Sequence, residues 1–288
     1  DGAISFAGGP FFKIDKRSKV EWLLSDVRHH HSLEVDENGN YWSPITYRPA
    51  KIPLEYSKDI SDFHDDGIRQ ISPNGDVIYE KSLTKIFMEN NLSSLLFTGG
   101  RRKDPMHLND IEPVRFSSKY WEKGDVFLSM KNVSLIVLYR PNTNKIIWSI
   151  RGPFFNQHDI DVLDEKRISI FNNNYKNYAD GDYIIGSNEI IIYDFESKIF
   201  SKYLQDAMSK YKISTKYEGL HEITRDGSLF VEETNGGTLF FFDPKGKLIW
   251  KYNNISSDGN LFRINWSRLM HTDKDIKTVK KFIKQIKT

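Results

Sequence analysis

The sequence predicts an all-β fold, a β-propeller of four-stranded antiparallel blades. Three observations predict it. A hairpin with a recurring turn and a closing aromatic residue is repeated along the chain, and a second kind of hairpin, which opens on a histidine, alternates with it. The two together recur every roughly 45 to 60 residues, a spacing typical of propeller blades.

The first hairpin reads as an apolar strand, a turn of the Asn-Gly or Pro-Lys-Gly kind, and a second apolar strand that ends on a bulky aromatic residue. Such turns join antiparallel strands tightly. Five copies predict five blades, and a sixth would need further sequence before Asp1. The copies span residues 12–22, 70–79, 138–148, 192–200 and 241–250.

The second hairpin begins with a histidine and supplies the other two strands of each blade. Copies start at His30, His158 and His221, and a fourth, at His107, is interrupted before a strand at residues 125–129. A β-sandwich with coincidental hairpins is the alternative fold. A sandwich has no reason to repeat one turn and one terminal aromatic, so the propeller is favoured.

The remaining segments are expected to complete or decorate the ring. Residues 1–272 form the propeller domain, whose two ends share one closing blade. Residues 46–66 form a loop broken by prolines, and residues 82–97 form an inserted helix with apolar side chains at helical spacing. Residues 273–288 form a basic amphipathic helix, which we expect to dock on the ring; contact with an anionic membrane is the alternative.

Composition excludes several classes of function. The chain has 288 residues with 41 Lys plus Arg against 39 Asp plus Glu, and this balance disfavours a nucleic-acid partner. It contains no cysteine, which excludes disulfides, cysteine-ligated zinc and thiol catalysis. No apolar run approaches the roughly 18 residues of a membrane span, and the first residues lack the pattern of a signal peptide.

Four of the eight histidines occupy the same position in their repeats: His30, His107, His158 and His221. Because the innermost strand of each blade lines the central channel, equivalent positions converge on one axis. Three interpretations stay open at this point. The imidazoles satisfy hydrogen bonds at strand starts, they bind a metal, or one of them is a nucleophile that accepts a transferred group.

Several strings resemble a known family. Residues 106–111 (MHLNDI), 157–164 (QHDIDVLD) and 232–239 (EETNGGTL), followed by 246–250 (GKLIW), are similar to the bacterial arylsulfotransferases, propeller enzymes that move sulfate between phenols without a nucleotide donor. The resemblance runs through nearly the whole chain in order. The His-x-Asn string followed by Gln-His in the next repeat is its more specific part.

The resemblance implies a ping-pong reaction through a sulfohistidine. His158 is similar to the nucleophile of the family, and His107 would give or take the phenol proton. Asn109 and His30 would help to hold the sulfuryl charge, together with Lys131, which stands where the family has an arginine. A flexible ammonium orients oxygens less well than a planar guanidinium, so this replacement puts activity in doubt.

A flat aromatic substrate needs stacking surface near the histidines. His221 is expected to line the same site, although no motif gives it a role. Packing between blades is the alternative role for the aromatic candidates. The candidates are Phe154, Phe155, Phe171 and Trp42.

The expected partners are an aryl sulfate donor and a phenolic acceptor, with no nucleic acid. No cofactor is expected, because the sequence has no glycine-rich phosphate loop and no Gly-x-Ser-x-Gly elbow. The resemblance implies a periplasmic or otherwise extracytoplasmic address. The alternative function is a non-catalytic propeller that binds a metal or an anionic ligand through its channel histidines.

Overall fold

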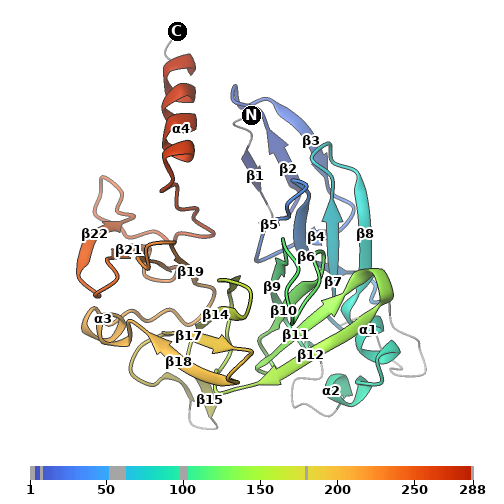
Figure 1. Ribbon diagram of the computed structural model, residues 1–288. Coiled ribbons are helices and arrows are strands. Elements are labelled where there is room, and N and C mark those ends of the chain that lie inside the picture. Colours follow the sequence, from blue (N-terminus) through green and yellow to red (C-terminus); the bar gives the residue numbers. More distant parts are fainter. Residues whose placement is uncertain (1–3, 7–8, 52–62, 98–102, 179–180, 287–288) are drawn as a thin grey trace.

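The computed structural model describes residues 4–6, 9–51, 63–97, 103–178 and 181–286. Within these residues antiparallel sheets dominate the structure. Four sheets of four or more strands follow one another as blades of a propeller (Figure 1). The predicted β-propeller fold is confirmed, but four blades are present where five were predicted, because the first predicted hairpin copy lies in a separate three-stranded sheet of the described residues.

The blades contain strands that are consecutive in the sequence, apart from one inserted hairpin. The first blade contains β4 (Arg28–His29), β5 (Glu34–Val35), β6 (Tyr41–Tyr47), β7 (Asp65–Ile71) and β8 (Val77–Ser82). The second contains β9 (Leu108–Pro113), β10 (Val126–Met130), β11 (Leu135–Arg140) and β12 (Lys145–Arg151). The third contains β13 (Ile160–Val162), β14 (Arg167–Asn172), β17 (Glu189–Asp194) and β18 (Ile199–Tyr203). The fourth contains β19 (Leu220–Ile223), β20 (Leu229–Glu233), β21 (Thr238–Phe242) and β22 (Leu248–Asn253).

The hydrophobic core lies between neighbouring blades. One apolar cluster joins the first blade to the second and includes Trp42, another joins the second to the third and includes Phe154, and a third joins the third to the fourth and includes Phe171. All three rings are at most 3% exposed. Burying a large apolar side chain contributes about 1.5–3 kcal/mol, so these clusters supply much of the stability between blades.

Buried aspartates of one blade hold the inner strand of the next blade. In each case the aspartate accepts a hydrogen bond from a backbone N–H of that inner strand. These bonds join different blades directly around the channel. They run from Leu108 N–H to Asp66 Oδ2 at 2.8 Å, from Ile160 N–H to Asp110 Oδ2 at 2.9 Å, and from His221 N–H to Asp159 Oδ2 at 2.9 Å.

Glu232 continues this pattern from the fourth blade to the segment that follows it. Its carboxylate is 1% exposed and accepts the backbone N–H groups of Trp266, at 3.2 Å, and Ser267, at 2.6 Å. The C-terminal segment is therefore held against the fourth blade by the same kind of contact that joins the other blades.

The C-terminal segment also reaches the first blade. The Trp266 indole donates to the carbonyl oxygen of Leu33 at 3.3 Å, and the Arg268 guanidinium donates to the same carbonyl and to Glu34 Oε1, the latter at 2.6 Å. These contacts close the ring between its fourth and first blades.

Ring closure differs from the predicted shared blade. The N-terminal strands β1 (Ile4–Phe6), β2 (Phe11–Ile14) and β3 (Val20–Leu24) form a three-stranded sheet, and within the described residues no C-terminal strand pairs with it. This sheet attaches to the first blade, where the Trp22 indole donates to Pro73 O at 3.0 Å. The C-terminal backbone instead uses its N–H groups on Glu232, so it is not available as a blade strand.

Insertions lie outside the ring. The segment predicted as one helix forms α1 (Leu83–Glu89) and α2 (Ser93–Phe97), with Ser82 capping α1. The third blade carries the hairpin of β15 (Tyr175–Tyr178) and β16 (Gly181–Ile184), and α3 (Gln205–Lys210) precedes the fourth blade. Of the predicted loop 46–66, residues 52–62 lie outside the described part, and β6 and β7 occupy its two ends.

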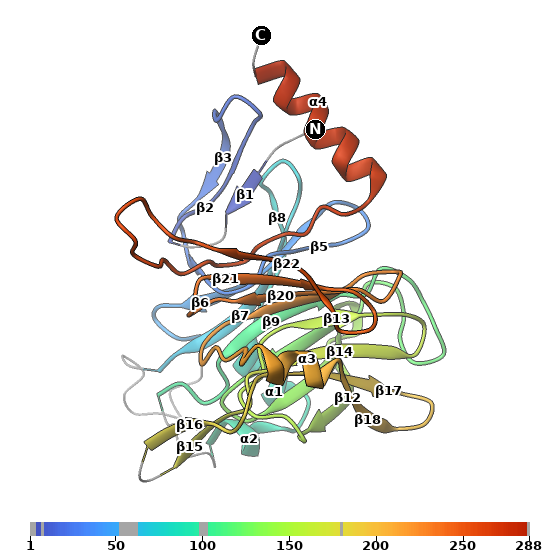
Figure 2. The same ribbon diagram turned by 90° about the vertical axis from the view of Figure 1, so that its left-hand side faces the viewer.

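Helix α4 (Asp273–Ile286) stands clear of the blades, as Figures 1 and 2 show from two directions. Ile276 and Ile283 on its apolar stripe are 37% and 48% exposed. The expectation that this helix docks on the ring is therefore wrong for this structure. The helix begins only after the segment that closes the ring, so closure does not depend on it.

We expect Glu232→Ala to lower the free energy of unfolding by about 2–4 kcal/mol, because two backbone N–H groups lose their acceptor, at about 1–3 kcal/mol each. Chemical denaturation followed by circular dichroism would measure the change. Glu165→Ala, on an exposed turn, is the control and should change stability by less than about 0.5 kcal/mol. Equal stability of the two variants would show that Glu232 does not hold the ring closed.

Candidate active site

Histidines of three blades meet at one end of the channel. His31 lies between β4 and β5, His107 directly before β9, and His158 two residues before β13. His31 and His107 adopt left-handed backbone conformations with φ of 55° and 56°. Residues other than glycine rarely adopt this conformation, so its occurrence at both positions marks a shared turn that directs the two side chains.

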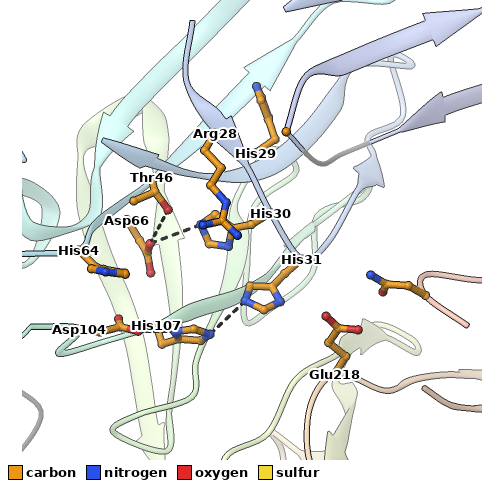
Figure 3. A pocket seen from close by; sticks show the side chains of 12 residues that line it. Arg28, His29, His30, His31, Thr46, His64, Asp66, Asp104, His107 and Glu218 are labelled. Atoms are coloured by element: carbon orange, nitrogen blue, oxygen red, sulfur yellow. Dashed lines mark hydrogen bonds and ion pairs between the residues drawn. The ribbon is translucent and has the colours of Figure 1, made fainter. Parts of the chain in front are cut away.

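His31 is the centre of the group. Its Nε2 atom lies 3.0 Å from His107 Nε2, as Figure 3 shows, and its ring centroid lies 5.0 Å from that of His107 and 5.8 Å from that of His158. The structure therefore brings His107 and His158 together through His31, and not through His30 as the sequence analysis expects.

His107 is oriented by a neighbouring carboxylate. Its Nδ1 lies 2.5 Å from Asp104 Oδ2, so the Nδ1 proton points to Asp104 and the Nε2 atom faces His31. A histidine held in this way presents Nε2 in a fixed orientation, which suits it to accept or donate a proton there.

His158 is held at both ring nitrogens. Nδ1 lies 2.8 Å from Asn173 Oδ1, and the Asn173 amide nitrogen donates to the carbonyl oxygens of Thr215 and Glu218, which fixes the orientation of the amide. Nδ1 therefore carries the proton. Nε2 has the free electron pair and accepts the backbone N–H of Glu218 at 2.9 Å.

The turn that carries this N–H depends on Gly219. Gly219 has a φ of +106°, and a Cβ at this position would lie 2.5 Å from Cε1 of the buried Phe171 ring. Only glycine fits both requirements. The turn at Glu218 and Gly219 thus places a backbone N–H directly over the electron pair of His158.

Lys131 places a positive charge beside these imidazoles. It lies in the turn between β10 and β11, is 7% exposed, and has its ammonium 4.9 Å from the centre of the Tyr217 ring. Burial, and after it the charge of Lys131, lowers the pKa of His158 well below 6.5. Burial and the neighbouring imidazoles, with Lys131, likewise lower the pKa of His31. Both rings are therefore neutral at pH 7.

Asn109 contacts the backbone next to His158. Its side-chain nitrogen donates to the carbonyl oxygen of Gln157 at 2.8 Å, while its Oδ1 atom is buried without a hydrogen-bond partner in the described part of the chain. In this structure Asn109 positions His158 through the backbone.

A cavity of about 320 Å³ opens beside the imidazoles, and five of the eight histidines line it (Figure 3). His30 lines it from behind His31, with Nε2 3.4 Å from Asp66 Oδ1. Two further side chains of opposite charge face this space, Arg28 and Glu218. His158 and Lys131 are not among the residues that line this cavity.

Comparison with known proteins agrees with the motifs. The sequence model described as "Arylsulfotransferase (ASST)" matches residues 9–255. The chain belongs to the arylsulfotransferase family. No curated protein matches it.

Among solved structures, the arylsulfotransferase chain is similar to a protein of unknown function from Bacteroides caccae, with a TM-score of 0.57 and 12% identity over 87% of this chain and 77% of that one. The WD40 β-propeller domain of Doa1 gives a TM-score of 0.49 at 11% identity, over 87% and 64% of the two chains. Only the first match has a TM-score above 0.5, and at 12% identity it shows the fold alone.

The aromatic residues expected to stack on an arylsulfotransferase substrate do not line the histidine cavity. Trp42, Phe154 and Phe171 are buried in the clusters between blades. Phe155 is 42% exposed, and the Lys176 ammonium lies 4.4 Å from its ring centre. The prediction of a stacking surface from the three buried rings is wrong, because their position between blades uses them as core.

His221 also lies outside the group formed by His31, His107 and His158. Its Nδ1 lies 2.6 Å from Asp159 Oδ2 and its Nε2 lies 2.7 Å from Ser169 Oγ, and it lines a different cavity. The sequence analysis missed His31, Asp104, Asn173 and the Glu218 backbone. His31 had a signal, since it adjoins His30 in a run of three histidines, but only the backbone turn decides which ring enters the site.

We expect the rings of His31 and His158 to remain neutral at pH 6, where an ordinary histidine of pKa 6.5 is mostly protonated. Heteronuclear NMR of the imidazoles across pH 5 to 8 would show this. Because Lys131 disfavours the charged forms, Lys131→Met should raise both pKa values. Titration of both rings at pH 6.5 or above in the unmodified protein would contradict this electrostatic description of the site.

Proposed function

We propose that this arylsulfotransferase-family chain transfers a sulfuryl group from an aryl sulfate to a phenolic acceptor, and that Nε2 of His158 carries the group between the two. Family membership supports sulfotransferase activity in general. The observation that carries the assignment to His158 is its fixed tautomer, with the proton on Nδ1 held by Asn173 and the electron pair on Nε2.

In the first half-reaction the electron pair of His158 Nε2 attacks sulfur, the bond between sulfur and the aryl oxygen breaks, and the phenolate leaves. A neutral nucleophile is needed, and the lowered pKa of His158 keeps this ring neutral. In the second half-reaction the oxygen of the acceptor phenol attacks sulfur, and the bond between sulfur and Nε2 breaks. No nucleotide is consumed in either half.

The pair of His31 and His107 is placed to move the phenol proton. The departing phenolate takes a proton, and the acceptor phenol loses one to the same pair. Asp104 stabilises His107 while it is protonated. Their Nε2 atoms are 3.0 Å apart, so a single proton can be shared between them.

Cationic groups would hold the three sulfuryl oxygens. Lys131 is a buried cation whose charge acts on His158, and Arg28 lines the cavity. Stabilising developing charge with groups that are already in place is usually the largest contribution to catalysis of this kind. Asn109 would act on His158 through Gln157, and His30 would support His31 from behind.

Attack by His158 requires that the Glu218 N–H leaves Nε2. We propose that the turn at Glu218 and Gly219 moves when donor binds, and that this N–H then contacts a sulfuryl oxygen. The same contact supports the second candidate function, a non-catalytic propeller that binds an anionic ligand, because it leaves no free electron pair on His158 in the present conformation.

We propose an extracytoplasmic address, because the family resemblance implies it and because the reaction uses no nucleotide. Among the described residues, every helix is too short or too polar to span a bilayer.

We expect His158→Gln to lower transfer from 4-nitrophenyl sulfate to a phenol by at least about 10³-fold, because the covalent route is lost. Liberated nitrophenol and sulfated acceptor would be measured. His271→Gln, outside the histidine cavity, is the control and should retain activity within about twofold.

Donor labelled with ³⁵S should leave an acid-labile, base-stable label on His158. Absence of both label and transfer in folded protein would leave the binding function and exclude the enzyme. Transfer without a label on any histidine would instead contradict the covalent intermediate alone.

We expect Lys131→Arg to increase kcat/KM for the donor by about threefold to tenfold, since a planar guanidinium can bind two sulfuryl oxygens at once. Steady-state kinetics would separate kcat from KM. Lys119→Arg, on the surface, should change neither. A fall in kcat/KM for a correctly folded Lys131→Arg protein would show that the site is fitted to the ammonium.

A further inference from the structure

A second cavity, of about 370 Å³, lies farther along the inner strands and is lined mainly by acidic side chains. Three of its carboxylates come a few residues after the candidate active-site histidines in the sequence. Glu34 follows His31, Glu112 follows His107, and Asp161 follows His158. The fourth blade contributes His221. This cavity takes no part in the proposed sulfuryl transfer.

Its central feature is a group of three potential ligands. One ligand atom each from Asp159, Asp161 and His221 lie within 4.8 Å of one another. His221 Nδ1 lies 2.6 Å from Asp159, which leaves the electron pair on Nε2, and Nε2 lies 3.6 Å from Asp161 Oδ2. Two ligands of one metal ion, each at about 2.1 Å, are separated by a comparable distance.

Glu112 gives independent support for a cation. It is 5% exposed, its side chain lines the cavity, and within the described residues it makes no hydrogen bond and no ion pair. Oδ2 of Asp161 is likewise buried without a hydrogen-bond partner among these residues. Buried carboxylates without partners are costly, and such groups are normally paired or coordinate metals.

The two arginines of the cavity do not supply the missing charge. Arg268 donates to Glu34 at 2.6 Å, and Arg115 lies 3.8 Å from Glu34 and also donates to the Val35 carbonyl oxygen. Both guanidinium groups are thus directed to one carboxylate.

We propose that this cavity binds one divalent metal ion, with Asp161 and His221 as ligands, Asp159 orienting His221 and offering its second oxygen, and Glu112 on the facing wall. A mixed set of carboxylates and one imidazole fits Mn²⁺ or Zn²⁺. Carboxylate, imidazole and metal then form the usual chain in which the carboxylate fixes the histidine tautomer. The Ser169 hydroxyl, now 2.7 Å from Nε2, gives way to the ion.

The two ligands come from β13 and β19, and Glu112 faces them from β9, so the ion connects the third and fourth blades and lies against the second. Its effect is therefore expected on stability. Binding to the folded state alone raises the midpoint of thermal unfolding in proportion to the logarithm of the ion concentration.

The test is titration of the full chain with Mn²⁺, followed by electron paramagnetic resonance and by thermal unfolding. We expect one Mn²⁺ per chain, a raised unfolding midpoint, and a nitrogen coupling in electron spin echo spectra. Asp161→Asn should weaken Mn²⁺ binding by at least tenfold, and His221→Gln should remove the nitrogen coupling. Circular dichroism without metal would establish that both variants are folded.

Two controls locate the site. Glu222→Gln removes a charge at the rim of the same cavity, where Glu222 lies 3.5 Å from His271, and should change affinity by less than about twofold. His107→Gln should leave Mn²⁺ binding intact. Loss of binding in His107→Gln would move the metal to the histidine cavity and overturn the proposal, as would binding that survives in Asp161→Asn. Failure of Mn²⁺ and Zn²⁺ to bind at 1 mM would show that the carboxylates simply hold protons.

Discussion

The structure depends on one repeated contact, in which a buried carboxyl group of one blade accepts a backbone N–H from the segment that begins the next. Asp66, Asp110 and Asp159 make it between successive blades, and Glu232 makes it to the C-terminal segment. A hydrogen bond is more directional than apolar packing between sheets. The apolar clusters supply stability between blades, whereas these bonds set the position of each inner strand around the channel.

The relative positions of the candidate active-site histidines depend on how these contacts place the blades. His31, His107 and His158 belong to three blades, and an error of an ångström in the placement of one blade would separate their rings. Each ring is also fixed locally, His107 by Asp104 and His158 by Asn173. Burial together with Lys131 keeps the central rings uncharged. The chemical state of these imidazoles is thus set by their surroundings and not by residue type alone.

The sequence was sufficient for the fold class, because hairpin turns and closing aromatics are local signals that survive in the structure. It also predicted that His107 and His158 lie close together, and in the structure His31 lies beside both rings. It failed where the outcome depends on non-local geometry. Whether His30 or His31 enters the channel is decided by a single left-handed residue, and whether Phe154 and Phe171 face substrate or core is decided by the neighbouring blade. The group that donates to Nε2 of His158 is the backbone N–H of Glu218, which side-chain patterns cannot reveal.

The closure of the ring has a consequence for how the protein is made. Leu33 and Trp266, which meet across the closing contact, are 233 residues apart in the chain. Bringing such distant segments together carries a loop-closure entropy, and it can happen only after Trp266 has left the ribosome. During synthesis the first blade therefore lacks its contact with the fourth. A chain interrupted before Trp266 has no closed ring.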